Sequence, residues 1–270
     1  MKKPPNTFKQ SATYQKVRHI YHWIINQINI LPQLFTIPKP EKVSWLDFVY
    51  ILSHVNRYQP LVFADGSVIS RMQNQTILDS RQRLELIQLP QDLTGKTVLD
   101  IGCAEGFFVV QSALRNAKHA TGCDMLASRL KMGQIVAQSW MLQDTTTFSQ
   151  TLLYDIPKEC ATDIVMCFAM AHHLHGGDHD TWHIISDRVK RSSAFANMLR
   201  AVTAVAALTK EITYWEYAFE YENEKPTDVD HAILGQIWVE QGIYEKVDFI
   251  GLSQSLPHKD RALYKAYKHA

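Results

Sequence analysis

The chain has 270 residues, of which 46% are hydrophobic and 20% are charged, and its formal net charge is +1. This composition excludes wholesale disorder, and the near-zero net charge provides no overall field that would attract nucleic acid or an anionic membrane. Residues 1–60 carry eight basic and two acidic side chains, an excess that a solvated helical face explains more simply than an anionic partner does.

Residues 1–70 are predicted to form a mainly helical extension, which would serve as a lid or as an oligomer contact, as in a homodimer. The spacing of apolar residues predicts a helix over 11–30, and a serine N-cap followed by an aspartate predicts a second helix over 44–58. The turn signal Asp65-Gly66 predicts a short hairpin. The apolar-leaning stretch 20–37 contains too many polar residues and prolines to span a membrane.

Residues 71–270 are predicted to form one domain in which strands and helices alternate. Such alternation predicts an α/β, Rossmann-like fold with a seven-stranded, mostly parallel sheet, helices on both faces and a C-terminal antiparallel hairpin strand. The predicted helices are 71–89, 105–116, 126–142, 181–208 and 228–241, and the predicted strands are 97–102, 119–124, 146–153, 162–169, 211–219, 246–254 and 262–268.

The four cysteines, Cys103, Cys123, Cys160 and Cys167, lack the C-x-x-C spacing of metal sites, and three of them fall in or beside predicted strands. They are predicted to be buried free thiols in a reducing compartment. The first residues do not form a signal peptide, so the sequence predicts a soluble, cytoplasmic protein.

The most informative stretch is 97–108, in which an apolar run ends in Asp100 and glycines follow at positions 102 and 106. It predicts a strand, a tight turn and a helix N-terminus, the geometry of a nucleotide-type site. An acid at the end of the strand would repel a pyrophosphate but suits a cationic ligand such as S-adenosyl-L-methionine (SAM), whereas the missing glycine of G-x-G disfavours a nicotinamide cofactor. Cofactor contacts are predicted at Asp100, Gly102, Cys103, Ala104, Gly106 and Phe107.

Two later strand ends complete the predicted cofactor site. Asp124, followed by Met125, ends the second strand and could accept hydrogen bonds from the ribose hydroxyls or only cap the next helix. Tyr154 and Asp155 follow the third strand, where Tyr154 could sandwich the adenine and Asp155 could accept from its amino group. A plain turn before the next proline is the alternative.

The stretch after the fourth strand is rich in histidine. It begins beside Phe168, another predicted cofactor contact, and His172 or His173 could deprotonate an acceptor hydroxyl or amine. A histidine that only shapes the site is the alternative, because positioning alone can suffice for an in-line displacement. The residues from His172 to His183 also form a dense ligand cluster, but its spacing is not that of a closed zinc site, so no metal is predicted. Glu216 and Glu220, at or past the end of the fifth strand, could face the acceptor.

With these residues placed, the chain from about residue 60 resembles the class I SAM-dependent methyltransferases. Within them it is most similar to the group around the bacterial tRNA wobble-uridine 5-oxyacetic-acid methyltransferase. In two places it departs from that group: Ala104 replaces the usual glycine, and His172 replaces the tyrosine of Y-H-L. The resemblance rests on Asp65-Gly66, the stretch DLTGKTVLDIG at 92–102, Glu105-Gly106-Phe107-Phe108 in place of D-G-F-F, Tyr154-Asp155 and His172-His173-Leu174.

The resemblance implies SAM as the cofactor and a methyl acceptor beside His173 or His172. The predicted function is transfer of a methyl group to an oxygen or nitrogen atom of a small-molecule acceptor. An RNA methyltransferase that holds phosphates with its basic N-terminal segment is one alternative, weakened by the near-neutral charge and by the lack of an arginine-rich groove. A non-catalytic partner subunit with a methyltransferase fold is another, disfavoured by the intact cofactor motif.

Overall fold

The computed structural model describes residues 37–54, 59–69, 80–168, 170, 193–220, 226–256 and 259–268. The predicted helix over 11–30 lies outside these residues, and the domain boundary at residue 70 stays a prediction. Ahead of the main sheet are α3 (Trp45–Ser53), β1 (Leu61–Val62), β2 (Val68–Ile69) and α4 (Ser80–Leu86). The elements that follow are β3 (Thr97–Ile101), α5 (Phe107–Ala113), β4 (His119–Asp124), α6 (Ala127–Ser139), β5 (Thr146–Gln150), η1 (Leu153–Asp155), η2 (Lys158–Cys160), β6 (Thr162–Cys167), α9 (Ser193–Ala207), β7 (Thr209–Glu220), α10 (Asp228–Glu240), β8 (Lys246–Leu256) and β9 (Lys259–Tyr267).

Seven strands form one mixed sheet in the order β5-β4-β3-β6-β7-β9-β8. β3 pairs in parallel with both β4 and β6, whereas β9 runs antiparallel to β7 and to β8. The chain therefore builds the sheet outward from β3 in one direction and from β6 in the other. Ligands of open α/β sheets bind at such a reversal, beyond the carboxyl ends of the strands. The predicted fold, including its C-terminal antiparallel hairpin, is confirmed.

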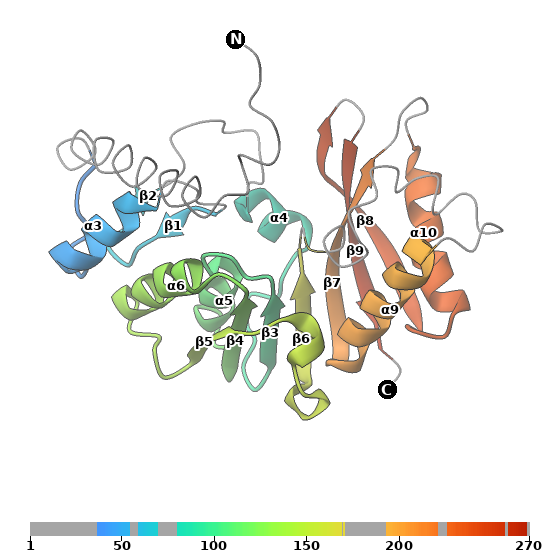
Figure 1. Ribbon diagram of the computed structural model, residues 1–270, viewed down its shortest axis with the longest axis horizontal. Coiled ribbons are helices and arrows are strands. Elements are labelled where there is room, and N and C mark those ends of the chain that lie inside the picture. Colours follow the sequence, from blue (N-terminus) through green and yellow to red (C-terminus); the bar gives the residue numbers. More distant parts are fainter. Residues whose placement is uncertain are drawn as a thin grey trace, which may run out of the picture.

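The two faces of the sheet pack against different helices. Trp215 belongs to a core cluster shared with α9 and α10, whereas Val98 and Tyr214 belong to a cluster shared with α5 and the end of α4. Because side chains alternate along a strand, Asp100 and Glu216 lie on the α4 and α5 side. Figure 1 shows α9 and α10 beside β7, β8 and β9 at one end of the molecule, and α5 and α6 beside β3, β4 and β5 at the other.

α3 and the β1–β2 hairpin pack on α6, whereas α4 contacts α5 and β8 (Figure 1). Phe48 of α3 and Leu61 of β1 share a core cluster with Ile135 of α6. The indole Nε1 of Trp140, which follows α6, donates a hydrogen bond to the carbonyl oxygen of Val62 at 2.9 Å. The β1–β2 hairpin predicted from its turn signal is therefore anchored to the main sheet through α6.

Several elements end at other residues than the sequence predicts. α4 ends before the predicted limit of 89, because Gln88 takes a left-handed conformation with φ of 46°. β5 ends at Gln150, and the chain then forms the short 3₁₀ helix Leu153–Asp155 in place of the predicted end of the strand. In α4 the turn at Gln88 comes before Pro90, the proline that marks the end of the helix in the sequence.

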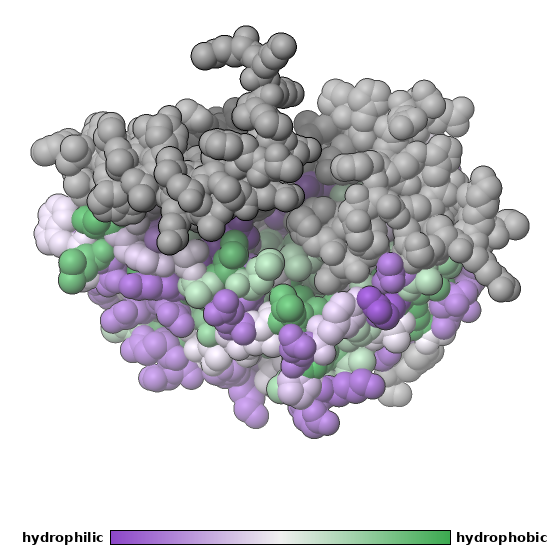
Figure 2. Space-filling view, in the orientation of Figure 1, coloured by the Kyte–Doolittle hydropathy of each residue, from purple (hydrophilic) through white to green (hydrophobic). Residues whose placement is uncertain are grey.

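Three of the four cysteines are buried in the core, and the fourth is exposed. Cys103, Cys123 and Cys167 are buried free thiols as predicted, and Cys160 is exposed. Among the coloured residues of Figure 2, hydrophilic ones predominate, with apolar patches between them. Within the ranges that the structure describes, no helix combines the length and the apolar character needed to cross a membrane.

Candidate active site

The loop between β3 and α5, residues 102–106, is held by hydrogen bonds within the protein. Five backbone N–H groups in the loop and at the start of α5 already donate to protein acceptors, so these five are not available to bind a pyrophosphate. This geometry agrees with the sequence argument against a dinucleotide site. The donors and acceptors are Gly102 and Cys103 to the carbonyl of Cys123 (2.8 and 2.9 Å), Ala104 to Asp124 Oδ2 (3.0 Å), Gly106 to the carbonyl of Cys103 (2.8 Å) and Phe107 to Gln59 Oε1 (2.9 Å).

Two glycines shape this loop in the way their spacing predicts. Gly102 and Gly106 have φ angles of 72° and 75°, a conformation that side chains disfavour. A Cβ atom at Gly102 would lie 2.3 Å from Cγ of Met170, and one at Gly106 would lie 2.4 Å from Cε1 of Phe148. The contact with Met170 brings the segment after β6 directly against the loop, so the two strand ends that flank the reversal of the sheet meet here.

Asp100 is buried at the end of β3, and its Oδ2 atom has no hydrogen-bond partner among the described residues. Burial and the nearby Asp124 raise the pKa of Asp100 to about 8, although Arg83 opposes the shift. The carboxyl is therefore mostly protonated near neutral pH, and an unpaired buried oxygen of this kind is unusual in folded proteins. A cationic ligand beside Asp100 would both satisfy the oxygen and favour its ionised form.

Asp124 accepts hydrogen bonds from two backbone N–H groups, but it is not the cap of α6, whose N-cap residue is Leu126. Its Oδ1 accepts a hydrogen bond from the backbone N–H of Leu126 at 2.8 Å, next to the start of α6, and its Oδ2 accepts from Ala104 at 3.0 Å. These bonds fix the carboxylate at the end of β4 and tie it to the loop. Each carboxylate oxygen keeps further acceptor capacity, so a fixed Asp124 is suited to receive a pair of hydroxyl groups.

Large apolar side chains are exposed around Asp124, at the ends of β4 and β5. Tyr154 and Leu152 are 49% and 54% exposed, and the guanidinium carbon of Arg200 lies 5.2 Å from the centre of the Tyr154 ring. Asp155 is exposed in η1. Exposed apolar groups gathered in one place mark a binding surface more often than a stability feature. We call these exposed residues, Met125, Leu126, Leu152 and Tyr154, the apolar rim.

The other predicted site residues are divided between the core and the undescribed part of the chain. Cys103, Phe107 and Phe168 are buried and belong to the core cluster on the α5 side. Ala104 is also buried, with a left-handed φ of 48°. The two predicted catalytic histidines, His172 and His173, lie outside the described residues, as does the rest of the histidine cluster.

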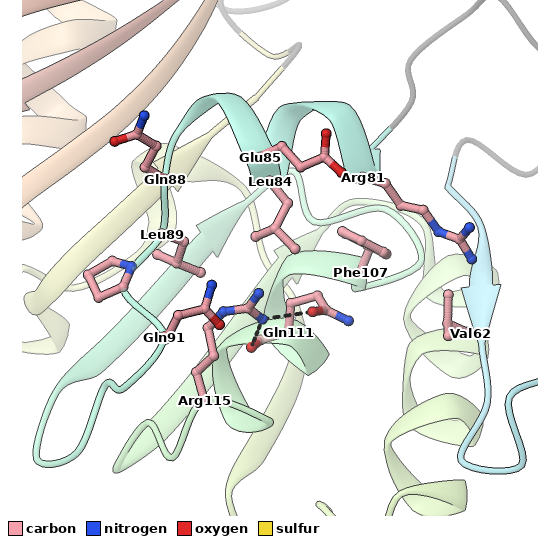
Figure 3. Close-up of a pocket in the computed structure, with 11 residues that line it drawn as sticks. Val62, Arg81, Leu84, Glu85, Gln88, Leu89, Gln91, Phe107, Gln111 and Arg115 are labelled. Atoms are coloured by element: carbon pink, nitrogen blue, oxygen red, sulfur yellow. Dashed lines mark hydrogen bonds between the residues drawn. The ribbon is translucent and has the colours of Figure 1, made fainter.

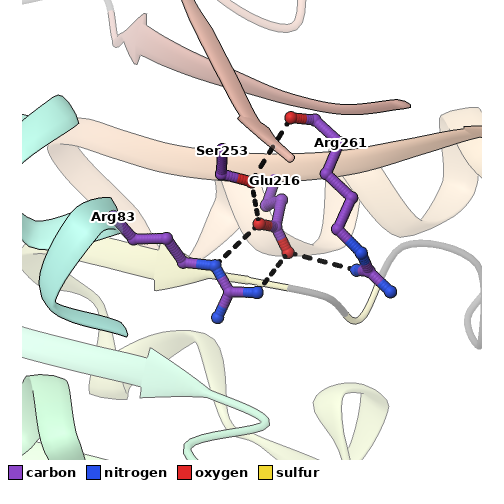
Figure 4. Close-up of polar contacts among 4 residues, drawn as sticks. All are labelled: Arg83, Glu216, Ser253 and Arg261. Carbon is purple, nitrogen blue, oxygen red and sulfur yellow. Dashed lines mark hydrogen bonds and ion pairs between the residues drawn. The ribbon is translucent and has the colours of Figure 1, made fainter. Parts of the chain in front are cut away.

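Glu216 is placed differently from the sequence expectation. It lies inside β7 rather than at or past its end, is fully buried, and is bound by two arginines and a serine (Figure 4). Figure 4 shows Arg83 of α4 and Arg261 of β9 approaching the carboxylate from opposite sides. The contacts are Arg83 Nε to Oε1 (2.7 Å), Arg83 Nη2 to Oε2 (3.1 Å), Arg261 Nη1 to Oε2 (3.2 Å) and Ser253 Oγ to Oε1 (2.5 Å).

A cavity of about 730 Å³ lies outside the predicted site, between β1, α4 and α5 (Figure 3). Among the predicted site residues only Phe107 lines it. Figure 3 shows Arg115 beside Gln111 in this cavity, where Arg115 Nη1 donates to the backbone carbonyl and the side-chain oxygen of Gln111 at 2.8 and 2.7 Å. Neither Asp100 nor Asp124 lines this cavity, so it is separate from the predicted cofactor site.

Comparison with known proteins finds no matching family model. Over 99 residues the chain is 30% identical to the ribosomal protein L11 methyltransferase of Histophilus somni strain 2336, and the match covers 37% of this chain and 31% of that protein. The same enzyme of strain 129Pt matches equally. The chain thus spans less than a third of the length of the curated relatives that it matches.

Two solved structures share the fold. The magnesium protoporphyrin IX methyltransferase ChlM from Synechocystis PCC 6803 with bound SAH has a TM-score of 0.50 and 15% identity, covering 70% of this chain and 83% of that one. Monomeric WbdD has a TM-score of 0.50 and 18% identity, covering 81% of this chain and 48% of that one. The chain has the class I SAM-dependent methyltransferase fold, as the sequence predicts.

Proposed function

We propose that this protein transfers a methyl group from SAM to an oxygen or nitrogen atom of a small-molecule acceptor. The observation that carries the proposal is Asp100, a buried acid at the end of β3 with one oxygen that no described residue pairs. In this proposal it receives the ammonium group of SAM, while the fixed carboxylate of Asp124 receives the ribose hydroxyls. SAM supplies a methyl group activated by its sulfonium.

The remaining predicted residues fit roles around these two acids. Gly102 and Gly106 keep side chains out of the loop, and Cys103 and Ala104 present only backbone to the ligand. In this proposal the apolar rim, Met125, Leu126, Leu152 and Tyr154, contacts the adenine, and Asp155 accepts a hydrogen bond from the adenine amino group. Phe107 and Phe168 support the loop from the core. The residues cited lie at the carboxyl ends of β3, β4, β5 and β6.

The acceptor side is assigned to the segment after β6, whose Met170 lies against Gly102. In the proposal, His173 or His172 takes the proton from the acceptor hydroxyl or amine as the new bond to carbon forms. This removes the positive charge that the acceptor atom would otherwise retain. Positioning of the acceptor in line with the sulfonium accounts for the rest of the rate.

A protein side chain is a second candidate acceptor, favoured by the match to ribosomal protein L11 methyltransferase over 99 residues. We further infer that the chain is related to the tRNA wobble-uridine 5-oxyacetic-acid methyltransferase group, because its motifs at 92–108 and 154–155 resemble those of that group. Both readings use the same cofactor site. An acceptor screen that compares small molecules, ribosomal protein and tRNA with labelled SAM separates them.

Calorimetric titration with SAM and with S-adenosylhomocysteine (SAH) tests the cofactor site. We expect micromolar binding, about −8 kcal/mol, and a loss of about 100-fold in Asp124→Ala, because the ribose hydroxyls lose their acceptors. Asp144→Ala, in the exposed turn before β5, is the matched control and should bind like the unaltered protein. A folded protein that binds neither ligand would refute the proposal and favour the non-catalytic partner subunit.

A further inference from the structure

Gln59, just before β1, is joined to the cofactor loop by two hydrogen bonds. Its side-chain Oε1 accepts from the backbone N–H of Phe107 at 2.9 Å, and its own backbone N–H donates to Oε2 of Glu105 at 3.0 Å. Gln59 is 8% exposed and Glu105 is 1% exposed. A residue 46 to 48 positions away in sequence thus holds both the carboxylate and the amide that end the loop.

The bond to Phe107 pairs the first backbone N–H group of α5. The N-cap of α5 is Gly106, which has no capping side chain, so Phe107 is the first helical residue. The first backbone N–H groups of a helix lack partners inside the helix, and a buried one that stays unpaired is costly. The oxygen of Gln59 therefore satisfies a donor that the helix itself cannot pair.

Gln59 and the cofactor loop are each held by a further part of the protein. Gln59 continues into the hairpin, whose Val62 carbonyl accepts a hydrogen bond from Trp140. On the far side of the loop, Phe148 fills the space that a Cβ at Gly106 would need. Because neither neighbour can move freely, a change at Gln59 must be taken up by the loop itself.

We propose that Gln59 is a positioning residue that sets the geometry of the cofactor loop, so that SAM affinity depends on a side chain outside the sheet. It acts through Phe107 and Glu105 and makes no contact with the reacting atoms. This inference rests on the proposed function, because it assumes that the loop binds SAM. Through Gln59, the segment that contains the β1–β2 hairpin would then contribute to SAM binding.

The test is SAH binding by calorimetry in Gln59→Met, which keeps the length of the side chain and removes the acceptor oxygen. We expect Kd to rise about tenfold, the value of one buried hydrogen bond. Gln59→Glu, which retains an acceptor oxygen, should stay within about twofold of the unaltered protein. Gln82→Met, the same change on the exposed face of α4, should bind like the unaltered protein.

Hydrogen exchange at the Phe107 amide in the unaltered protein gives a second readout that needs no variant to fold. We expect SAH to slow this exchange, because the bond to Gln59 tightens as the loop is ordered. SAH binding with no change at Phe107, or unaltered affinity in Gln59→Met, would overturn the inference and leave the proposed function standing. Absence of SAH binding to the unaltered, folded protein would instead refute the proposed function, and the inference with it.

Discussion

Asp100→Asn is expected to weaken SAH binding by about 100-fold, ~2.7 kcal/mol, and at the same time to stabilise the ligand-free protein. The weaker binding follows because an amide cannot supply a negative charge to the ligand ammonium. The greater stability follows because the carboxyl of Asp100 is buried, and one of its oxygens has no partner in the part of the chain that the structure describes. Residues placed for ligands commonly reduce the stability of the free fold.

The pH dependence of stability follows from the raised pKa. Asp100 has a pKa of about 8 in the folded protein, against 3.8 for an ordinary aspartate. Between these values the folded state holds a proton that the unfolded state has released, so the free energy of unfolding falls as pH rises, by at most ~1.4 kcal/mol per pH unit. The loss is complete above about pH 8. Urea unfolding of the ligand-free protein from pH 5 to 9 should therefore show Asp100→Asn gaining on the unaltered protein as pH rises.

The same shift predicts proton release on binding. A ligand ammonium beside Asp100 lowers its pKa, so near neutral pH the complex sheds the proton that the free protein carries. Titrations in two buffers of different ionisation enthalpy should differ in apparent enthalpy for the unaltered protein and agree for Asp100→Asn. Asp144→Asn, in the exposed turn before β5, is the control for both measurements. Equal SAH affinity in Asp100→Asn would show that Asp100 does not face the ligand.

Glu216→Gln is expected to destabilise the fold by about 3–5 kcal/mol, because it leaves Arg83 and Arg261 buried without their counter-ion. The two arginines are 4% and 9% exposed, and Nε of Arg261 already has no hydrogen-bond partner among the described residues. Burial lowers the pKa of Arg83, and Glu216 is the strongest group that raises it again. Thermal unfolding should show a drop in Tm of roughly 6 to 20 °C.

Glu211→Gln is the matched control for this change. It makes the same substitution in the same strand, but the ion pair of Glu211 with Lys96 is exposed, with side chains 44% and 42% accessible. Exposed pairs contribute roughly 0–1 kcal/mol, so its Tm should change little. Adding Arg83→Gln to Glu216→Gln should restore part of the stability, since one uncompensated charge is removed. Equal effects of Glu216→Gln and Glu211→Gln would refute the assignment of Glu216 as the counter-ion of the cluster.

Local patterns were sufficient to predict the fold and the positions of the two acids that end β3 and β4. The apolar run that ends at Asp100, with glycines at 102 and 106, predicts a strand, turn and helix because each step depends on residues close in sequence. Asp124 could be placed for the same reason, at the end of the next strand. The roles proposed for His172 and His173 stay predictions, because both lie outside the described residues.

Contacts between distant segments were not predictable in this way. Glu216 in a strand suggests a group that faces a pocket, but its partner Arg83 is 133 positions away and reaches it from α4. Gln59 carries no motif at all, and only the structure shows it at the start of α5. Nothing in the local pattern of either residue indicates its partner, because the pairing depends on which strands and helices lie side by side.

The sequence by itself determined the α/β class, the alternation of elements and the acids at the ends of β3 and β4, because these depend on hydrophobic period and turn chemistry within a few residues. Only the tertiary structure decided that Asp100 is buried with an oxygen unpaired among the described residues, that Glu216 is neutralised by two arginines, and that Gln59 accepts from the first N–H of α5. Burial and charge pairing are properties of packed surfaces, and the order of strands that brings those surfaces together is set by the whole chain.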